Sequence, residues 1–254
     1  MRECEKGSRR EKRQAVLANR LLYFCVFVLM YICTLNKPRR NGQMTKVIAV
    51  LNQKGGAGKT TVATNLACWL HASGHKVVLV DLDPQGSSTE WSETRESDDV
   101  FPVMGMGKQV ARDLPRVTGG YDYVILDGAP QISELITPAI KIADAVLIPC
   151  QPSPFDIYAC EDLVDLIHAR REVTDGKPKA AFVVSRAIKN THLGREVRDA
   201  LAEYNLPIFN ALTTQRVAYA DCANGGSVMD LPEGDKARQE IEALGKETLE
   251  FIHG

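Results

Sequence analysis

The sequence is organised around a glycine-rich octet, Lys54-Gly55-Gly56-Ala57-Gly58-Lys59-Thr60-Thr61, which lies between two apolar segments. Residues 47–51 before it form an apolar run typical of a short, buried strand. Residues 62–71 after it place their apolar side chains at helical spacing. The three glycines allow several backbone N–H groups to converge on an anion, at the end of a helix whose dipole favours negative charge. The octet therefore predicts a phosphate-binding loop.

Three side chains of this loop are candidates for distinct roles. Lys59 is placed to neutralise the β- and γ-phosphates, and the Thr60 hydroxyl to ligate Mg²⁺. The usual nucleotide-loop pattern has glycine where this chain has Gln53, and Lys54 stands next to it. With Lys59 at the phosphates of its own chain, Lys54 is available to reach the phosphate of a partner across a two-fold axis. The alternative is a solvated surface lysine beside a glycine turn.

Two further apolar runs end in carboxylates. Residues 76–80 lead into Asp81 and Asp83, and residues 121–126 lead into Asp127. In an open parallel sheet, carboxyl ends of strands lie where ligands bind. We expect Asp83 to orient the attacking water or to hold the Mg²⁺ shell, and Asp81 to act in the second shell behind it. Asp127 is expected to reach Mg²⁺, directly or through water. An Asp-Pro turn that merely closes a strand is the alternative at Asp83.

The rest of the chain continues the alternation of strands and helices. Strands are expected at 145–149, 180–184 and 206–208, and helices near 155–173, 215–223 and 236–253. The predicted fold is α/β, with a three-layer, mostly parallel twisted sheet flanked by helices. The loop at 149–154 and Ser185-Arg186 follow strands and are candidates for the adenine site.

Charge and cysteine content separate the amino-terminal segment from the body. Of 31 Lys and Arg residues, ten lie in 1–43, whereas only three of the 32 Asp and Glu residues do; residues 44–254 hold 21 basic and 29 acidic residues. An acidic body can contact nucleic acid only through a local basic patch. The seven cysteines form no C-x-x-C pair, which predicts buried thiols in a reducing cytosol without a disulfide or metal framework.

Residues 1–43 are expected to lie outside the fold. They contain a basic stretch and an apolar run at 21–35, which is short for a spanning helix and has no clean cleavage site. Two interpretations stand: a membrane anchor, or an upstream stretch included by assigning the start too early. We favour the second, because Met44 lies just before the first strand. A single ATPase domain is then expected over 44–254.

Taken together, the motifs resemble those of ParA-type partition ATPases, a branch of the deviant-loop family that includes MinD and the nitrogenase iron protein. The resemblance runs from Met44 to the carboxyl terminus. It is carried by the octet, by Val80-Asp81-Leu82-Asp83-Pro84-Gln85-Gly86, by Ile125-Leu126-Asp127-Gly128-Ala129-Pro130 and by Thr213-Thr214-Gln215-Arg216. The core begins directly at Met44, with no helix-turn-helix region between Met44 and the first strand. In this the chain resembles the small class of partition ATPases, in which the ATPase does not repress its operon.

The resemblance implies roles for individual residues and for partners. Lys54 matches the signature lysine that crosses to the partner's nucleotide, Lys59 the in-chain phosphate lysine and Thr60 the Mg²⁺ ligand. Asp83 matches the water-orienting carboxylate and Asp127 the Mg²⁺-shell carboxylate. ATP would close a homodimer that binds DNA nonspecifically, and a centromere-binding (ParB-like) partner protein would trigger slow hydrolysis. The implied location is the cytoplasm, on the nucleoid, without stable membrane association.

A group of basic residues in the carboxyl-terminal third provides candidate DNA contacts: Arg186, Lys189, Arg195, Arg198 and Arg216. Such a group would bind phosphates with steep salt dependence. Arg216 is the strongest candidate because it lies in the family's motif. An ordinary solvated helix face is the alternative.

Related classes fit less well. A nitrogenase-type reductase requires cysteines near Asp127 to hold an iron–sulfur cluster, and an iron–sulfur carrier requires a C-x-x-C pair. A MinD-like membrane cycler requires a basic amphipathic tail. This chain has none of these patterns. A ParA-like ATPase that positions a cargo other than plasmid DNA, and a nucleotide switch without turnover, remain open alternatives to DNA segregation.

Overall fold

The computed structural model describes residues 44–96, 101–130, 133–188 and 193–254, without the side chains of 133 and 193–195. The amino-terminal segment 1–43 lies outside these ranges, so both interpretations of it stay predictions. No helix in the described ranges is long and apolar enough to cross a membrane. Free thiols are present on Cys68, Cys150, Cys160 and Cys222.

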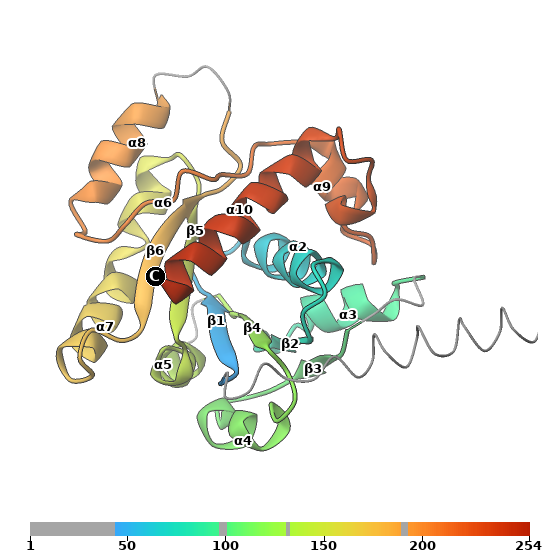
Figure 1. Cartoon of the computed structure of the whole chain (residues 1–254). Helices are drawn as coiled ribbons and strands as arrows, with labels where there is room; N and C mark the ends of the chain where they lie inside the picture. The colour runs from blue at the N-terminus through green and yellow to red at the C-terminus, as the bar shows by residue number, and fades with distance from the viewer. Residues whose placement is uncertain (1–43, 97–100, 131–132, 189–192) are drawn as a thin grey trace, which may run out of the picture. The chain divides into compact units, whose positions relative to one another are not determined.

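The centre of the fold is a six-stranded sheet in the order β3-β2-β4-β1-β5-β6 (Figure 1). All neighbouring strands run parallel. Their bounds are β1 Lys46–Val50, β2 Val77–Asp81, β3 Val103–Gly105, β4 Tyr123–Asp127, β5 Ala145–Cys150 and β6 Lys179–Val184. Because the strands are parallel, every loop that follows a strand emerges at one edge of the sheet.

Helices cover both faces of the sheet. One face carries α2, α3 and α10, and the other carries α4 to α8 (Figure 1). Their bounds are α2 Lys59–Ala72, α3 Ser87–Glu93, α4 Val110–Val117, α5 Ser133–Ile142, α6 Pro154–Tyr158, α7 Glu161–Glu172, α8 Leu193–Ala202, α9 Val217–Asp221, η1 Val228–Asp230 and α10 Lys236–His253. The three-layer α/β fold predicted from the sequence is therefore confirmed.

Alternate residues of each strand pack on opposite faces, which explains the uninterrupted apolar runs. In β1, Ile48 and Val50 pack with the α2 and α10 side, while Val47 and Ala49 pack with the α5 and α7 side. A strand covered on both faces has no position that favours a polar side chain. Polar groups are consequently concentrated at the strand ends.

The structure differs from the sequence prediction in three elements. The edge strand β3 was not predicted, because Val103–Gly105 is too short to give a periodic signal. The helix expected near 155–173 is two helices, α6 and α7, separated at Ala159 and Cys160. The expected strand at 206–208 is reduced to one bridge between Phe182 and Ile208.

Candidate nucleotide-binding site

The glycine-rich loop joins β1 to α2 at the carboxyl edge of the sheet. Gly56 and Gly58 have φ angles of 76° and 96°, and Gly58 caps the amino end of α2. These left-handed conformations are readily available only to glycine. Since no side chain caps α2, its first N–H groups face the loop and are available to an anion.

Neighbouring strand ends hold this loop in place. The Ser185 hydroxyl donates to the Ala57 carbonyl at 2.7 Å, and the Gln151 amide donates to the Gly56 carbonyl at 2.7 Å. Asn52 accepts a hydrogen bond from the Lys54 N–H at 2.8 Å and donates to the Pro149 carbonyl at 2.7 Å. Sequence reasoning missed Asn52 and Gln151 as loop supports. Their only signal is a polar residue directly after a buried strand.

Lys59 lies deep in the loop. Its side chain is buried, and its ammonium donates to the Lys54 carbonyl at 2.9 Å. Burial lowers the pKa of Lys59, and the negative charges of Asp127 and Asp83 act against this shift. A buried ammonium is incompletely compensated by this one hydrogen bond, so a phosphate here would supply the missing countercharge.

Asp127, at the end of β4, is fully buried and faces the start of α2. Ser88 donates to its Oδ2 at 2.7 Å, while Oδ1 has no hydrogen-bond partner among the described residues. Burial raises the pKa of Asp127 to about 7, against the effects of Ser88, the nearby Thr60 hydroxyl and Lys59. Sequence reasoning also missed Ser88, whose only signal is its position at the start of a helix.

The oxygens of Asp127 and Thr60 fit a hard divalent cation. Mg²⁺ is usually held by one or two protein oxygens and completed by phosphates and water. The part of the chain that the structure describes contains no group of three or more His, Cys, Asp or Glu residues that could hold a metal ion alone. A cation at this place would therefore depend on phosphate oxygens for its remaining ligands.

The two carboxylates after β2 differ in their surroundings. Asp81 is buried beside Asp127 and accepts hydrogen bonds from the N–H groups of Asp83 at 3.0 Å and Thr89 at 2.9 Å. Asp83 is only partly buried and accepts from the N–H of Gln85 at 3.0 Å. A cavity of about 530 Å³ opens beside Asp83. Both carboxylates line this cavity, Asp81 from a buried position and Asp83 from a partly exposed one. The water-orienting role of Asp83 stays a prediction.

The Lys54 ammonium has a carboxylate as its partner, unlike that of Lys59. It lies 2.8 Å from Oδ2 of Asp156 on α6, and 36% of the side chain is exposed, against 6% for Asp156. Lys54 is thus held within its own chain by a nearly buried carboxylate. Sequence reasoning did not identify Asp156, because the contact joins residues 102 positions apart.

Among the described residues, the candidate DNA contacts have separate surroundings. Arg216 donates through Nε and Nη2 to Oε1 of Glu240 at 3.0 and 2.8 Å, and Arg198 donates to the Phe209 carbonyl at 2.9 Å. Arg186 is exposed, with a φ of 51°. Lys189 and the side chain of Arg195 lie outside the described residues. A DNA-binding role for these residues stays a prediction.

The arrangement defines the class of protein: a P-loop nucleotide-binding protein with a parallel α/β sheet. Its phosphate loop follows the central strand β1, and buried carboxylates end β4, which pairs with β1, and β2, which pairs with β4. The CobQ/CobB/MinD/ParA nucleotide binding domain model matches residues 48–228, and the chain belongs to this family.

Two relatives align along most of their length. The maintenance of carboxysome distribution protein A of Halothiobacillus neapolitanus is 31% identical over 208 residues, which cover 80% of this chain and 95% of the relative. The chromosome-partitioning ATPase Soj of Thermus thermophilus is 30% identical over 217 residues, covering 72% and 86%. The resemblance to ParA-type proteins is thereby confirmed at the level of the family.

Solved structures show the same fold at lower identity. The ATP complex of a Cyanothece McdA variant has a TM-score of 0.69 and 17% identity, covering 84% of this chain and 98% of that one. Cobyrinic acid a,c-diamide synthase of Mycobacterium smegmatis, with bound ADP and magnesium, has a TM-score of 0.65 and 21% identity, covering 83% and 96%.

Proposed function

We propose that the protein is a ParA-like positioning ATPase, in which an ATP-dependent homodimer on nucleoid DNA distributes a cellular cargo. The observation that carries this proposal is the presence of two lysines in one phosphate loop with different surroundings. Lys59 is buried at the helix start, whereas Lys54 is partly exposed and paired with Asp156. Because Lys54 pairs with Asp156 while Lys59 lies at the helix start, the two lysines have separate surroundings, which supports a role for Lys54 across a dimer interface.

In this proposal each side chain has a physical task. The loop N–H groups and Lys59 bind the β- and γ-phosphates of ATP, while Thr60 and Asp127 hold Mg²⁺. Held there, Mg²⁺ would supply positive charge against the phosphates. Asp83 orients the attacking water, and Lys54 leaves Asp156 to contact the partner's nucleotide. Turnover is slow until a partner protein completes the site.

The similarity to the carboxysome-distribution protein supports a cargo other than DNA. The similarity to Soj supports a second candidate, DNA segregation with a centromere-binding (ParB-like) partner. Both candidates share the nucleotide cycle and the nonspecific DNA contact. They differ in the cargo that the partner protein connects to the ATPase.

Mass measurement in solution tests the shared cycle. We expect a monomer with ADP and a dimer with ATP and Mg²⁺, and co-elution with duplex DNA only in the ATP state. Phosphate release should be slow and should rise when DNA and the partner are added. A chain that stays monomeric with ATP contradicts the proposal; a dimer without turnover, even with DNA and the partner, identifies a nucleotide switch. To distinguish the two candidate cargoes, the protein encoded by the adjacent gene is tested for binding to centromere DNA. Binding favours DNA segregation, and no binding favours another cargo.

A further inference from the structure

Ser88 is a buried side chain beside the candidate cation site, and the proposed function gives it no task. It lies in the first turn of α3, and its hydroxyl donates to Oδ2 of Asp127 at 2.7 Å. The serine just before it, Ser87, is exposed. A hydroxyl is costly to bury unless it is hydrogen-bonded, so the contact with Asp127 accounts for the burial of Ser88.

The backbone of Asp127 is held by both neighbouring strands. Asp127 pairs in register with Val50 of β1 on one side and with Asp81 of β2 on the other. Its carbonyl also accepts a hydrogen bond from the N–H of Leu82 at 2.9 Å. Because the backbone is fixed, the freedom that remains is rotation of the side chain, and the hydrogen bond from Ser88 restricts that rotation.

The two oxygens of the Asp127 carboxylate have different surroundings. Ser88 occupies Oδ2, whereas Oδ1 is buried and has no hydrogen-bond partner among the described residues. Buried polar groups are normally hydrogen-bonded, so an open oxygen calls for a ligand such as a water or an ion. The Thr60 hydroxyl and the Lys59 ammonium both act to lower the pKa of Asp127, so this carboxylate faces the phosphate loop.

The segment that carries Ser88 is joined to both strands that end in carboxylates. Thr89, the next residue, donates through its N–H and its hydroxyl to Oδ2 of Asp81, at 2.9 and 3.2 Å. The turn before α3 is closed by the N–H of Gly86, which donates to the Asp83 carbonyl at 2.8 Å. Adjacent side chains thus connect α3 to the ends of β2 and β4, which fixes the place of the Ser88 hydroxyl.

We propose that Ser88 is a positioning residue for the cation: its hydroxyl holds Oδ2 of Asp127, so that Oδ1 is left for Mg²⁺ or for a water of its shell. Naming the cation rests on the proposed function, whereas the orientation of the carboxylate rests on the contacts above. Ser88 acts only through Asp127 and contacts neither nucleotide nor cation. Removing a side chain that orients a metal ligand typically lowers metal affinity ten- to hundredfold.

The test measures the ADP affinity of the full chain by calorimetry, once with excess EDTA and once with Mg²⁺. We define the Mg²⁺ gain as the ratio of the two affinities. The gain reports the cation site, whereas the affinity in EDTA reports the phosphate loop and the fold. In Ser88→Ala the gain should fall towards one, and the Mg²⁺ concentration that gives half of the gain should rise roughly tenfold or more. The affinity in EDTA should stay within about twofold of the wild type, because Ser88 does not touch the nucleotide.

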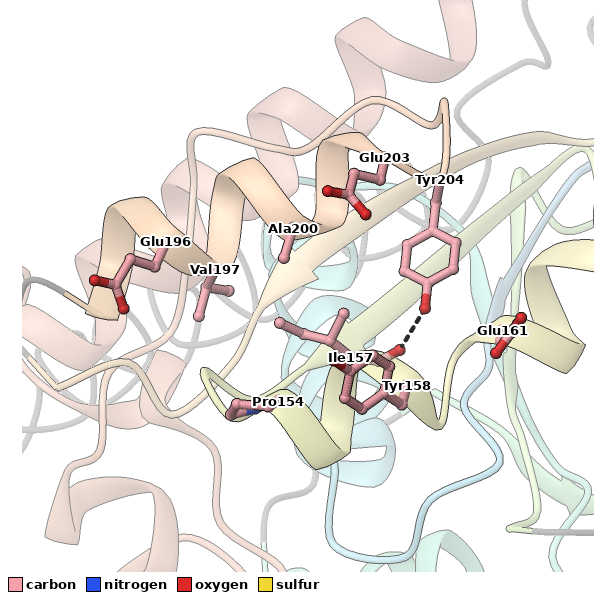
Figure 2. Close-up of a pocket in the computed structure, with 9 residues that line it drawn as sticks. All are labelled: Pro154, Ile157, Tyr158, Glu161, Glu196, Val197, Ala200, Glu203 and Tyr204. Carbon is pink, nitrogen blue, oxygen red and sulfur yellow. Dashed lines mark hydrogen bonds between the residues drawn. The ribbon is translucent and has the colours of Figure 1, made fainter.

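Three further variants separate positioning from stability. Ser87→Ala removes the exposed neighbouring hydroxyl, and Tyr204→Phe removes a hydroxyl that donates to the Ile157 carbonyl at 3.1 Å, at the groove between α6 and α8 (Figure 2). Both should keep the Mg²⁺ gain of the wild type, whatever the change in Tm. Ser88→Thr retains a hydroxyl donor and should keep most of the gain, even if its extra methyl group lowers the Tm.

A double variant links the effect to Asp127. Asp127→Asn should itself reduce the Mg²⁺ gain, because the cation loses a charged ligand. Adding Ser88→Ala to Asp127→Asn should reduce the gain no further, since the effects of residues that act through one contact are not additive.

Several outcomes overturn the inference alone. A wild-type gain in Ser88→Ala, or an equal loss of affinity in EDTA and in Mg²⁺, would leave Ser88 a purely structural role. Loss of the gain in Ser88→Thr to the same extent as in Ser88→Ala would assign the effect to packing at this position. A full gain in Asp127→Asn contradicts the cation ligand of the proposed function and overturns the inference with it. The expected gains in a chain that never dimerises with ATP contradict the proposed function and support the positioning role.

Discussion

The ammonium of Lys54 lies 2.8 Å from Oδ2 of Asp156, so a phosphate-loop lysine is paired with a carboxylate on the helix after β5. The other oxygen, Oδ1 of Asp156, is buried and has no hydrogen-bond partner among the described residues. The carboxylate is thus held by Lys54 from one side only. Transfer of Lys54 to a partner's nucleotide requires breaking this contact.

Lys54→Ala should separate nucleotide binding from dimer formation. We expect ADP affinity to change by no more than about fivefold, less than about 1 kcal/mol, because Lys54 pairs with Asp156 and is not assigned to the phosphates of its own chain. ATP-dependent dimerisation and hydrolysis should be lost. Calorimetry with ADP and mass measurement with ATP check this, with Lys246→Ala on exposed α10 surface as the control. Loss of ADP affinity as large as that in a Lys59 variant contradicts the cross-protomer role.

Lys59→Met should weaken nucleotide binding without destabilising the free protein. Burial lowers the pKa of Lys59, so its ammonium is poorly compensated when no phosphate is present. Replacing it with an apolar side chain of similar length removes this cost. We expect an unchanged or higher Tm for the free protein and ADP affinity lowered roughly ten- to hundredfold, the loss of one charge-assisted hydrogen bond. A lower Tm of the free variant would show that Lys59 stabilises the fold itself.

Glu240 should make stability depend on pH. Its burial acts to raise its pKa, but hydrogen bonds from Arg216, Thr214 and Tyr219 outweigh burial and lower the pKa below its ordinary value. Stability from this carboxylate is therefore complete above the unfolded pKa of about 4.3 and is lost as pH falls through the lower, folded value.

We expect Glu240→Gln to reduce the free energy of unfolding by about 1.5–3 kcal/mol at pH 7, from the loss of hydrogen bonds to a charged acceptor. The difference from the wild type should shrink at pH 3. Urea unfolding at both pH values measures it, and Glu250→Gln at an exposed position of the same helix is the control. A difference that is independent of pH would exclude the charge of Glu240 as its cause.

Gly245 should be intolerant of a side chain although it lies within a helix. A Cβ built at this position of α10 would come 2.1 Å from Cε3 of Trp69 on α2. Gly245→Ala gains up to about 1 kcal/mol in helix propensity. Overpacking typically costs about 1–3 kcal/mol, so we expect a lower urea midpoint overall. Trp69→Leu should relieve the clash in the double variant; a double variant with the summed loss contradicts this explanation.

Arg216 and Glu240 together test the DNA contact. If Arg216 contacts phosphate, Arg216→Ala should weaken nonspecific DNA binding in the ATP state and lower the salt slope by about 0.9. Glu240→Gln should leave binding equal or tighter, because it removes a negative charge 2.8 Å from the guanidinium. Gel shifts at fixed salt, with dimer mass measured in parallel, check both variants. An unchanged shift for Arg216→Ala removes it from the interface.

The sequence alone determined the class of fold and the phosphate loop, since both depend on local order. Short apolar runs are typical of strands buried on both faces, and a glycine-rich turn followed by Lys59 and Thr60 predicts a helix that begins at an anion site. Asp81 and Asp127 were also identified from order alone, because residues that end parallel strands meet at one edge.

Only the tertiary structure decided which side chains support these groups. The Lys54–Asp156 pair, the Ser88–Asp127 hydrogen bond and the Arg216–Glu240 pair join residues 102, 39 and 24 positions apart. Such contacts arise from helix packing, which sets distances that no spacing along the chain encodes. The break between α6 and α7 has the same origin, since it lets Ile157 and Cys160 pack in the core while Asp156 meets Lys54.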